Sequence, residues 1–286
     1  MESSQENGII DLHTHSLMSD GSDSPIELVR KAEEGGLVGL ALTDHDTVKG
    51  VTTAKMEAEA MEMKFLEGVE IGCHDEFGNL HILGYFKDLE IERFSKDLEW
   101  VKKARNERNR KILEKLGVEG MPISMDRLKM YAGDDVIGRL HIAKSMLGEG
   151  YVSSMKEAFK RYLNVGGKCF VPRKTFTSRE AIELIKEYEG LAVMAHPFLI
   201  PAQKMELTRI IKGLVGLGID GIEVYYIENT PDETRFLENI SYKHNLMPTG
   251  GTDYHGINKA GVSLGVGRGD MSIPFSLMDR MLNEFR

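Results

Sequence analysis

The stretch Gly8-Ile-Ile-Asp-Leu-His-Thr-His15 decides how the rest of the chain is interpreted. Its first half is apolar and β-branched, which predicts a strand, and its second half carries two histidines at alternate positions. Alternate side chains of an extended backbone share a face, so His13 and His15 can point at one ion. Asp20 follows in Ser19-Asp20-Gly21, a sequence typical of a turn. The stretch therefore predicts a strand that ends in metal-binding side chains.

Further short apolar runs recur along the chain, at residues 37–43, 64–70, 80–85, 191–195, 221–225 and 246–250. Three capping-box sequences lie between or before these runs: Ser24-Pro-Ile-Glu27, Thr177-Ser-Arg-Glu180 and Thr230-Pro-Asp-Glu233. Each predicts the start of a helix, because the Ser or Thr side chain and the Glu side chain satisfy each other's backbone N–H groups. Strands that alternate with helices predict an α/β fold with mainly parallel strands.

Histidines and carboxylates gather at these runs, most of them at carboxyl ends. Besides His13, His15 and Asp20, they are His45, Glu70, His81, His196, Asp253 and His255. A single histidine beside a strand is more often a structural residue, but nine independent accidents do not explain the whole set. Active sites of α/β barrels are built at the carboxyl ends of the strands. The pattern therefore predicts one common site.

The donor types define the chemistry of that site. Imidazole and carboxylate without thiolate suit manganese, zinc or iron. Nine donors exceed what one ion takes, so we expect two or three divalent metal ions. Such clusters suit hydrolysis at phosphorus by a metal-activated hydroxide. The remaining ions then neutralise the nonbridging and leaving oxygens of the phosphate ester. No GxSxG, Walker A or GxGxxG motif offers a competing site.

Composition excludes several classes of protein. The 286 residues include only two cysteines and no CxxC motif, which excludes a disulfide framework and a zinc finger. The formal net charge of −9 disfavours a binder of duplex DNA. Residues 1–8 are polar and no apolar run approaches membrane-spanning length, so we expect a cytoplasmic protein with no membrane contact. No obligate protein partner is evident from the sequence.

The interval between the two groups of runs differs from the rest and predicts mostly helices. We expect a metal-binding domain from residues 1–90 and 190–286, with a helical insertion or cap at 91–189. Residues 94–117 hold eight Lys or Arg and four Asp or Glu, a local charge of +4. This stretch is either an ordinary solvated helix face or a basic lid over an anionic substrate.

Several motifs together resemble those of the PHP (polymerase and histidinol phosphatase) phosphoesterase superfamily. They are Asp11-Leu-His-Thr-His15 with Ser19-Asp20-Gly21, Thr43-Asp-His-Asp46, Gly68-Val-Glu70, His81-Ile-Leu-Gly84, Ala195-His-Pro197 and Gly251-Thr-Asp-Tyr-His255. The resemblance covers roughly residues 8–90 and 190–270. It implies a distorted seven-stranded (βα)7 barrel with three metal ions.

The resemblance also implies how the ligands are shared among the ions. The first ion would be held by His13, His15, Glu70 and Asp253. Glu70 would bridge to a second ion, held also by His81 and His196. The third ion would be held by Asp20, His45 and His255.

The middle segment resembles the insertion of PHP enzymes that act on nucleotides, including AMP phosphoesterases, 3′,5′-nucleotide bisphosphate phosphatases and a 5′→3′ exoribonuclease. The resemblance rests on residues 138–143, 158–163 and 169–172. In those enzymes an Arg-x-His pair faces the site. Arg139 would then clamp a phosphate, and His141 would contact a phosphate or protonate a leaving oxygen. The alternative is that both residues cap and pair within the insertion.

Other residues keep two interpretations. Gly138 and Leu140 stand where the family pattern has Thr or Ser and often Pro or Ala. Arg173 and Lys174 are weaker phosphate-binding candidates, or solvated loop residues. Glu223 either orients a ligand histidine or has a structural partner. Asp44 and Asp46 either orient His45 or shape its loop, and the second is the safer interpretation.

The resulting hypothesis is a metal-dependent phosphoesterase that hydrolyses phosphate esters of nucleotides. Its substrates would be AMP, a 3′,5′-nucleotide bisphosphate or a short single-stranded RNA 5′ end. One alternative is histidinol phosphatase, which the nucleotide-type insertion disfavours. Another is a PHP module that has lost activity and serves in binding. Degenerate members should lack metal ligands, whereas this chain has every expected one.

Overall fold

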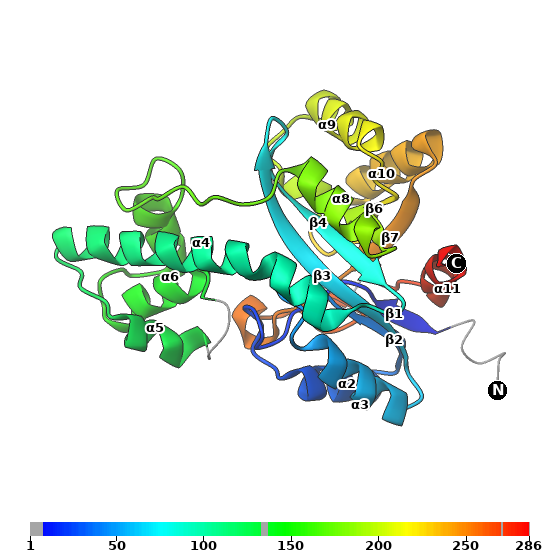
Figure 1. The fold of residues 1–286 in the computed structure, drawn as a ribbon, viewed down its shortest axis with the longest axis horizontal. Helices are drawn as coiled ribbons and strands as arrows, with labels where there is room; N and C mark the ends of the chain where they lie inside the picture. The colour runs from blue at the N-terminus through cyan, green and yellow to red at the C-terminus, as the bar shows by residue number, and fades with distance from the viewer. Residues whose placement is uncertain (1–7, 133–136, 270, 286) are drawn as a thin grey trace.

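A computed structural model describes residues 8–132, 137–269 and 271–285. Seven strands form one sheet in sequence order. They are β1 (Ile9–Asp11), β2 (Leu37–Leu42), β3 (Lys64–Asp75), β4 (Gly78–Phe86), β5 (Leu191–Met194), β6 (Gly221–Tyr226) and β7 (Met247–Gly251). The two ends of the sheet approach each other, where the Leu12 N–H donates to the Gly250 carbonyl at 3.2 Å. The sheet is thus a nearly closed barrel (Figure 1).

The strand directions are mixed. β1, β2 and β3 pair in parallel, as do β5, β6 and β7, but β4 is antiparallel to both β3 and β5. The expected alternation of strand and helix therefore fails between β3 and β4. An antiparallel pair needs only a tight turn, and Gly78, at φ 93°, supplies the left-handed backbone that the turn requires. β3 consequently extends five residues beyond its predicted end.

Helices pack around the barrel, and the last of them packs against the hydrophobic cluster inside it. They are α2 (Pro25–Glu34), α3 (Val51–Ala60), α8 (Ser178–Glu187), α9 (Lys204–Gly216), α10 (Pro231–His244) and α11 (Phe275–Glu284). The three predicted capping boxes are confirmed at the starts of α2, α8 and α10, with Ser24, Thr177 and Thr230 as the capping residues. Among the helices of the described residues, none combines the length and apolarity that crossing a membrane requires. Residues 1–7, which make up most of the polar N-terminal stretch, lie outside the described residues.

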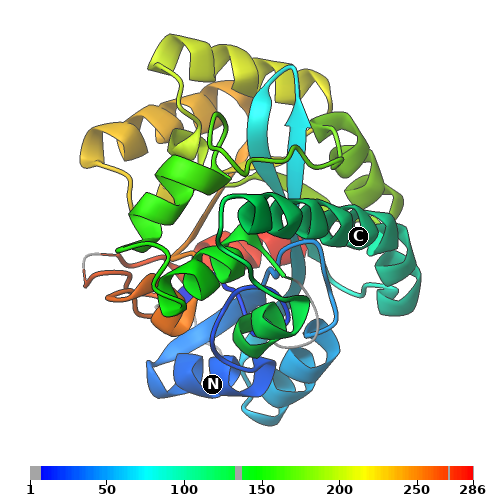
Figure 2. The same ribbon diagram turned by 90° about the vertical axis from the view of Figure 1, so that its left-hand side faces the viewer.

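The middle of the chain forms a helical lobe. It contains α4 (Ile91–Val118), α5 (Met125–Ala132), α6 (Arg139–Gly148), α7 (Met155–Ala158) and a turn of π-helix at Phe159–Leu163. The long α4 runs out of the barrel into this lobe, and a view along that direction places α5 and α6 in front of the barrel (Figures 1 and 2).

Two hydrophobic clusters share α4. Phe94 and Leu98 near its start are buried in the barrel cluster, and Ile112 and Leu116 near its end are buried in a separate cluster within the lobe. α8 packs back on β4, and its buried residues belong to the barrel cluster. Because both cores hold one continuous helix, α4 fixes the lobe against the barrel.

Candidate metal centre

The first strand delivers two histidines to the mouth of the barrel. Beyond β1 the backbone stays extended, and Thr14 forms a bridge to Tyr254 of the last strand region. The buried Asp11 carboxylate accepts hydrogen bonds from the backbone N–H groups of His13, Thr252 and Gly265. Burial raises the pKa of Asp11, and these hydrogen bonds oppose the rise. This carboxylate ties the two ends of the sheet together, which brings His13 beside Asp253.

One group of donors is formed by the residues assigned to the first ion. The Nε2 atom of His15 lies 3.2 Å from Glu70 Oε2 and 3.1 Å from Asp253 Oδ1. The Nε2 atom of His13 lies 3.3 Å from the same Glu70 oxygen. The four ligand atoms lie within 4.8 Å of one another. The four residues, separated by up to 240 positions in sequence, are thus in one place.

Glu70 also faces a second group through its other oxygen. Its Oε1 lies 2.6 Å from His81 Nδ1 and 2.9 Å from His196 Nε2. His45 Nδ1 approaches Oε2 at 2.9 Å and completes a compact triad with Glu70 and His81. Glu70 therefore contacts both groups. The compact triad contains His45, which the resemblance assigns to the third ion, and not His196.

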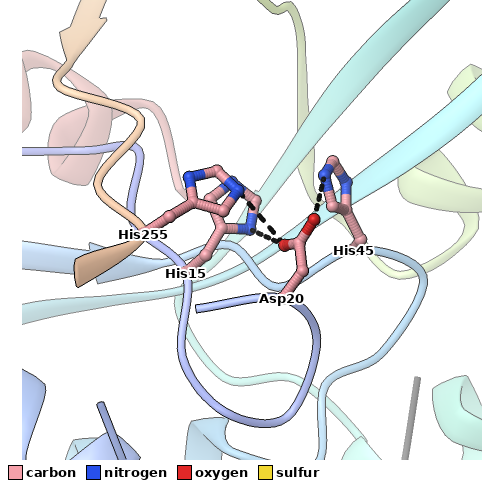
Figure 3. A group of neighbouring side chains, drawn as sticks. All are labelled: His15, Asp20, His45 and His255. Atoms are coloured by element: carbon pink, nitrogen blue, oxygen red, sulfur yellow. Dashed lines mark ion pairs between the residues drawn. The ribbon is translucent and has the colours of Figure 1, made fainter. Parts of the chain in front are cut away.

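A third group surrounds Asp20 and is drawn in Figure 3. The Oδ1 atom of Asp20 lies 3.1 Å from His255 Nε2, and its Oδ2 atom lies 3.8 Å from His45 Nε2. His15 Nδ1 is 3.9 Å from Oδ1. The group contains the three residues assigned to the third ion and adds His15, which faces the first group through its other nitrogen.

Unsatisfied polar atoms provide a test of whether these residues fit metal ions. His13 Nε2, both ring nitrogens of His15 and Glu70 Oε2 are buried and have no hydrogen-bond partner in the described structure. Burying a polar atom without a partner is costly. A bound cation would give a partner to His13 Nε2, to Glu70 Oε2 and to the one ring nitrogen of His15 that carries a lone pair, and nitrogen and oxygen donors suit first-row divalent metals. The residues present therefore fit divalent metal ions.

The pKa shifts within the cluster also fit a site that binds cations. Burial alone would lower the pKa of His13, yet Glu223, Glu70 and Asp253 together raise that pKa well above its usual value. Burial opposes ionisation of Asp20, Glu70 and Asp253 as well, but the surrounding histidines hold the pKa of each carboxyl well below its usual value. The carboxylates thus stay ionised and available to a cation.

Glu223 on β6 contacts two of the candidate ligands. Its Oε1 accepts from His13 Nδ1 at 2.9 Å, and its Oε2 accepts from the backbone N–H of His196 at 2.6 Å. Of the two interpretations, these contacts favour Glu223 as a carboxylate that orients two candidate ligands. The bond to Nδ1 leaves His13 Nε2 facing Glu70 and Asp253.

The two aspartates beside His45 shape loops, as the safer interpretation held. Asp44 accepts hydrogen bonds from the side chains of Ser16 and Ser19 and so shapes the segment that leads to Asp20. Asp46 accepts the Gly72 N–H at 3.2 Å and binds Arg105 and Arg173.

Three residues at the site have positive φ angles without being glycine. They are Asp46 at 52°, His196 at 27° and Asp253 at 50°. This region disfavours residues with a Cβ atom, so the surrounding contacts must hold the backbone there. Such strain is concentrated at sites where side-chain direction matters more than local stability.

The candidate phosphate-binding residues have the following contacts. Arg139 Nη1 donates to the Leu163 carbonyl at 3.2 Å, and His141 Nδ1 accepts the Gly138 N–H at 2.9 Å. Arg173 Nη1 lies 2.8 Å from Asp46 Oδ2, whereas Lys174 lies over the Trp100 ring. The hydrogen bonds of Arg139 and His141 are thus within the lobe. Burial lowers the pKa of His141 to about 4, and the charge of Asp20 opposes this shift.

Sequence reasoning did not single out two arginines of α4. Arg105 binds Asp46, and Arg108 is only 7% exposed, with Asn109 accepting from its Nε at 3.0 Å. Burial and the charges of Arg105, Arg173 and Arg139 lower the pKa of Arg108 to about 8. Within the described part of the chain, Arg108 and Arg139 form no ion pair.

These four arginines, here called the arginine cluster, consist of Arg105, Arg108, Arg139 and Arg173. Of the four, Arg105 and Arg173 bind the carboxylate of Asp46. For Arg105 and Arg108, the signal in the sequence is their spacing of three residues along α4, which puts them on neighbouring positions of one helix face. A buried excess of positive charge beside the metal centre suits a phosphorylated ligand.

Known proteins share the fold and much of the sequence. Residues 11–168 match the PHP domain family. A 5′-3′ exoribonuclease of Haemophilus influenzae is 34% identical over 245 residues, covering 86% of this chain and 89% of the relative. A 3′,5′-nucleoside bisphosphate phosphatase of Chromobacterium violaceum is 29% identical over 257 residues, covering 90% of each chain. A structure from Bifidobacterium adolescentis described as a metal-dependent phosphoesterase superposes with a TM-score of 0.85 at 28% identity, covering 97% and 96% of the two chains.

Proposed function

The chain belongs to the PHP domain family, and from this premise we propose that it is a metal-dependent phosphoesterase acting on phosphate esters of nucleotides. The observation that carries the proposal is the meeting of two features. Eight histidine and carboxylate side chains form three groups at the barrel mouth, His196 contacts Glu70 at 2.9 Å, and the arginine cluster lies beside them. The first suits metal ions and the second suits the phosphates of a substrate.

The proposed ligands are the nine residues predicted from the sequence. They are His13, His15, Asp20, His45, Glu70, His81, His196, Asp253 and His255. We propose two or three manganese, zinc or iron ions as their natural occupants. When bound, these ions supply a water of lowered pKa and neutralise phosphate oxygens.

The chain's own residues hold the substrate. Arg173 and Arg105 are oriented by Asp46, while Arg108 and Arg139 have guanidinium groups that no carboxylate neutralises in the described structure. We assign these groups to the phosphates of the nucleotide, which they can bind bidentately. Lys174, which lies over the Trp100 ring, is a weaker candidate for binding a phosphate.

His141 acts as a hydrogen-bond donor in this proposal. Its Nδ1 accepts the Gly138 N–H, so the proton of the neutral ring is on Nε2. With its pKa lowered to about 4, the ring is neutral near pH 7. We propose that Nε2–H donates to a phosphate oxygen or to the leaving oxygen of the ester.

The named relatives support a nucleotide or RNA substrate over histidinol phosphate, since one is an exoribonuclease and another a nucleoside bisphosphate phosphatase. The inactive-module alternative is disfavoured by the complete donor set. We also propose the domain division at 1–90, 91–189 and 190–286, in which the last helix of the insertion, α8, packs on the barrel. The insertion supplies Arg105, Arg108, Arg139 and Arg173. A cytoplasmic location and the absence of duplex DNA, membrane and protein partners belong to the same proposal.

A substrate panel with added Mn²⁺ tests the function. It contains AMP, adenosine 3′,5′-bisphosphate, histidinol phosphate and 5′-phosphorylated oligoribonucleotides, with phosphate and nucleoside products identified. We expect turnover of at least one nucleotide or RNA substrate and none of histidinol phosphate. Turnover of histidinol phosphate alone would reverse the assignment, and no turnover of any ester by metal-loaded protein would favour the binding module.

A further inference from the structure

Glu70 and Asp253 are the two carboxylates of the group assigned to the first ion, and their oxygens have different partners. Both oxygens of Glu70 face imidazoles, since Oε1 lies 2.6 Å from His81 Nδ1 and Oε2 lies 3.2 Å from His15 Nε2. The Asp253 carboxylate faces imidazoles through Oδ1, at 3.1 Å from His15 Nε2 and 3.5 Å from His255 Nδ1. Its other oxygen, Oδ2, is held by two side chains that are not candidate ligands.

These two side chains are Tyr226 and Lys259. The Tyr226 hydroxyl donates to Asp253 Oδ2 at 3.0 Å, and Lys259 Nζ donates to the same oxygen at 2.8 Å. The two donors also contact each other, because Lys259 Nζ lies 3.2 Å from the Tyr226 hydroxyl and 5.1 Å from the centre of its ring. Tyr226 is only 5% exposed, and the Lys259 side chain is 20% exposed. The pair is therefore a largely buried donor site for one oxygen of Asp253.

The two donors come from different elements and together fix the rotation of the carboxylate. Tyr226 is the last residue of β6, whereas Lys259 ends a turn of 3₁₀-helix at Gly256–Lys259. Asp253 itself has a φ of 50°, in the left-handed region that disfavours residues with a Cβ atom. The local backbone preference therefore does not hold this side chain in place, and its contacts must do so.

We propose that Tyr226 and Lys259 are positioning residues that restrict Asp253 to binding a divalent metal ion through one oxygen. The inference rests on the metal-binding part of the proposed function and concerns how one ligand is held. A carboxylate can bind a cation with one oxygen or with both. Two hydrogen bonds to Oδ2 leave Oδ1 as the oxygen that is free for the ion. Glu70, with imidazoles at both oxygens, keeps both of them available.

Charge alone predicts the opposite effect for Lys259. Its ammonium group lies beside a cation site, so simple repulsion would make metal binding tighter once this charge is removed. Positioning predicts weaker binding, because the released carboxylate loses its orientation. Tyr226→Phe separates the two effects, since it removes one hydrogen bond and changes no charge.

Metal binding measured without substrate tests the proposal. Mn²⁺ is titrated into the metal-free full chain, and calorimetry gives Kd. Tyr226→Phe and Lys259→Met should each raise Kd about ten-fold, the lower end of the usual loss when a partner of a metal ligand is removed. Lys259→Arg keeps the charge and N–H donors, so it should restore most of the affinity. Melting curves in chelator show whether any loss reflects unfolding.

A second background shows whether the effect passes through Asp253. Tyr226 also lies beside a candidate ligand, with its ring centre 5.6 Å from that of His196. In Asp253→Ala the carboxylate is gone, so adding Tyr226→Phe should leave Kd unchanged. Equal losses from Tyr226→Phe in the parent and in Asp253→Ala would mean that Tyr226 acts by another route, and would overturn the proposal.

Tyr242→Phe/Lys243→Met is the matched control, because it makes the same two changes at exposed positions of α10. Its Kd should match that of the parent. An unchanged or lower Kd in Tyr226→Phe would overturn the proposal, and a lower Kd in Lys259→Met would overturn the role of the lysine. If the parent hydrolyses no nucleotide ester but its Mn²⁺ affinity depends on Tyr226 and Lys259, the proposed function is overturned and the positioning role is supported.

Discussion

Glu223 shows how one carboxylate can control two ligands without being one. Its two oxygens hold the His13 ring and the backbone of His196, which has a φ of 27°. Glu223→Gln keeps the size but places an amide NH₂ against one of these two N–H groups. Loss of such an orienting partner costs about 10–100-fold in metal affinity. We expect that loss in a Mn²⁺ titration followed by calorimetry.

Glu228→Gln is the control for this substitution, since Glu228 is an exposed carboxylate close by in sequence. It should bind Mn²⁺ like the parent. Parent-like affinity in Glu223→Gln as well would show that the two hydrogen bonds are structural and do not set ligand geometry.

Arg108 is the residue for which stability and activity should respond in opposite directions. It is buried and forms no ion pair among the described residues, and burial together with three arginines lowers its pKa to about 8. Replacing a buried uncompensated charge by an apolar side chain of similar length is often neutral or stabilising. Arg108→Met should therefore keep or raise the free energy of unfolding in urea. It should also lower kcat/KM for the nucleotide substrate about 10–100-fold, which corresponds to about 1.4–2.7 kcal/mol.

Arg110→Met on the same helix is the comparison, because Arg110 is exposed and pairs with Glu114 at 4.0 Å. Its kcat/KM should match the parent. A large loss of stability in Arg108→Met, with parent-like kcat/KM, would contradict a substrate-binding role for Arg108.

At the scale of elements, the helix starts that depend on residues close together in the sequence could be predicted. Thr230 and Glu233 form a capping box in the sequence, and the structure has its reciprocal hydrogen bonds. The β3–β4 hairpin was missed because the segment between two apolar runs could hold either a turn or a helix. Its antiparallel pairing depends on contacts of β4 with β5, more than 100 residues away.

The start of α6 should make stability depend on pH. His141 Nδ1 accepts the Gly138 N–H only while the ring is neutral, and the folded pKa is about 4 against 6.5 for the free side chain. Between these values the unfolded chain binds more protons, so stability falls as pH is lowered from 6.5 toward 4. His141→Asn removes this contribution. Urea unfolding of metal-free protein should therefore show a shallower loss over this window in the variant.

His74→Asn serves as the control for this pH profile, because His74 is exposed. It should keep the slope of the parent. Parallel profiles for the parent and His141→Asn would mean that His141 titrates near 6.5 in the folded protein, and its assignment as a neutral donor would be wrong.

At the scale of the whole molecule, the net charge of −9 hides a separation of charge. The carboxylates Asp20, Glu70 and Asp253 meet histidines at the barrel mouth, and the arginine cluster meets them from the lobe. The donor set could be predicted because strand ends converge in any such barrel. The arginine cluster could not, since Arg105, Arg139 and Arg173 come together only through the packing of α4, α6 and the loop before α8.

Metal ions should therefore stabilise the whole fold, not only the site. Ligand binding to the folded state adds about 2.7 kcal/mol at a concentration 100 times Kd. The melting temperature of the parent should rise with Mn²⁺ and fall with chelator. His13→Ala/His15→Ala should lose most of this difference, because these residues carry three of the buried atoms that lack hydrogen-bond partners in the described structure.

The difference between the metal and chelator curves is diagnostic, and the absolute melting temperature is not. Removing two histidines takes counter-charge from Glu70 and Asp253, so the double variant should melt lower than the parent in chelator whatever the site binds. His74→Ala, at an exposed position, should keep the full metal-dependent difference. If the double variant kept it too, the ions would bind elsewhere. The converging histidines and carboxylates would then be a structural ion-pair network.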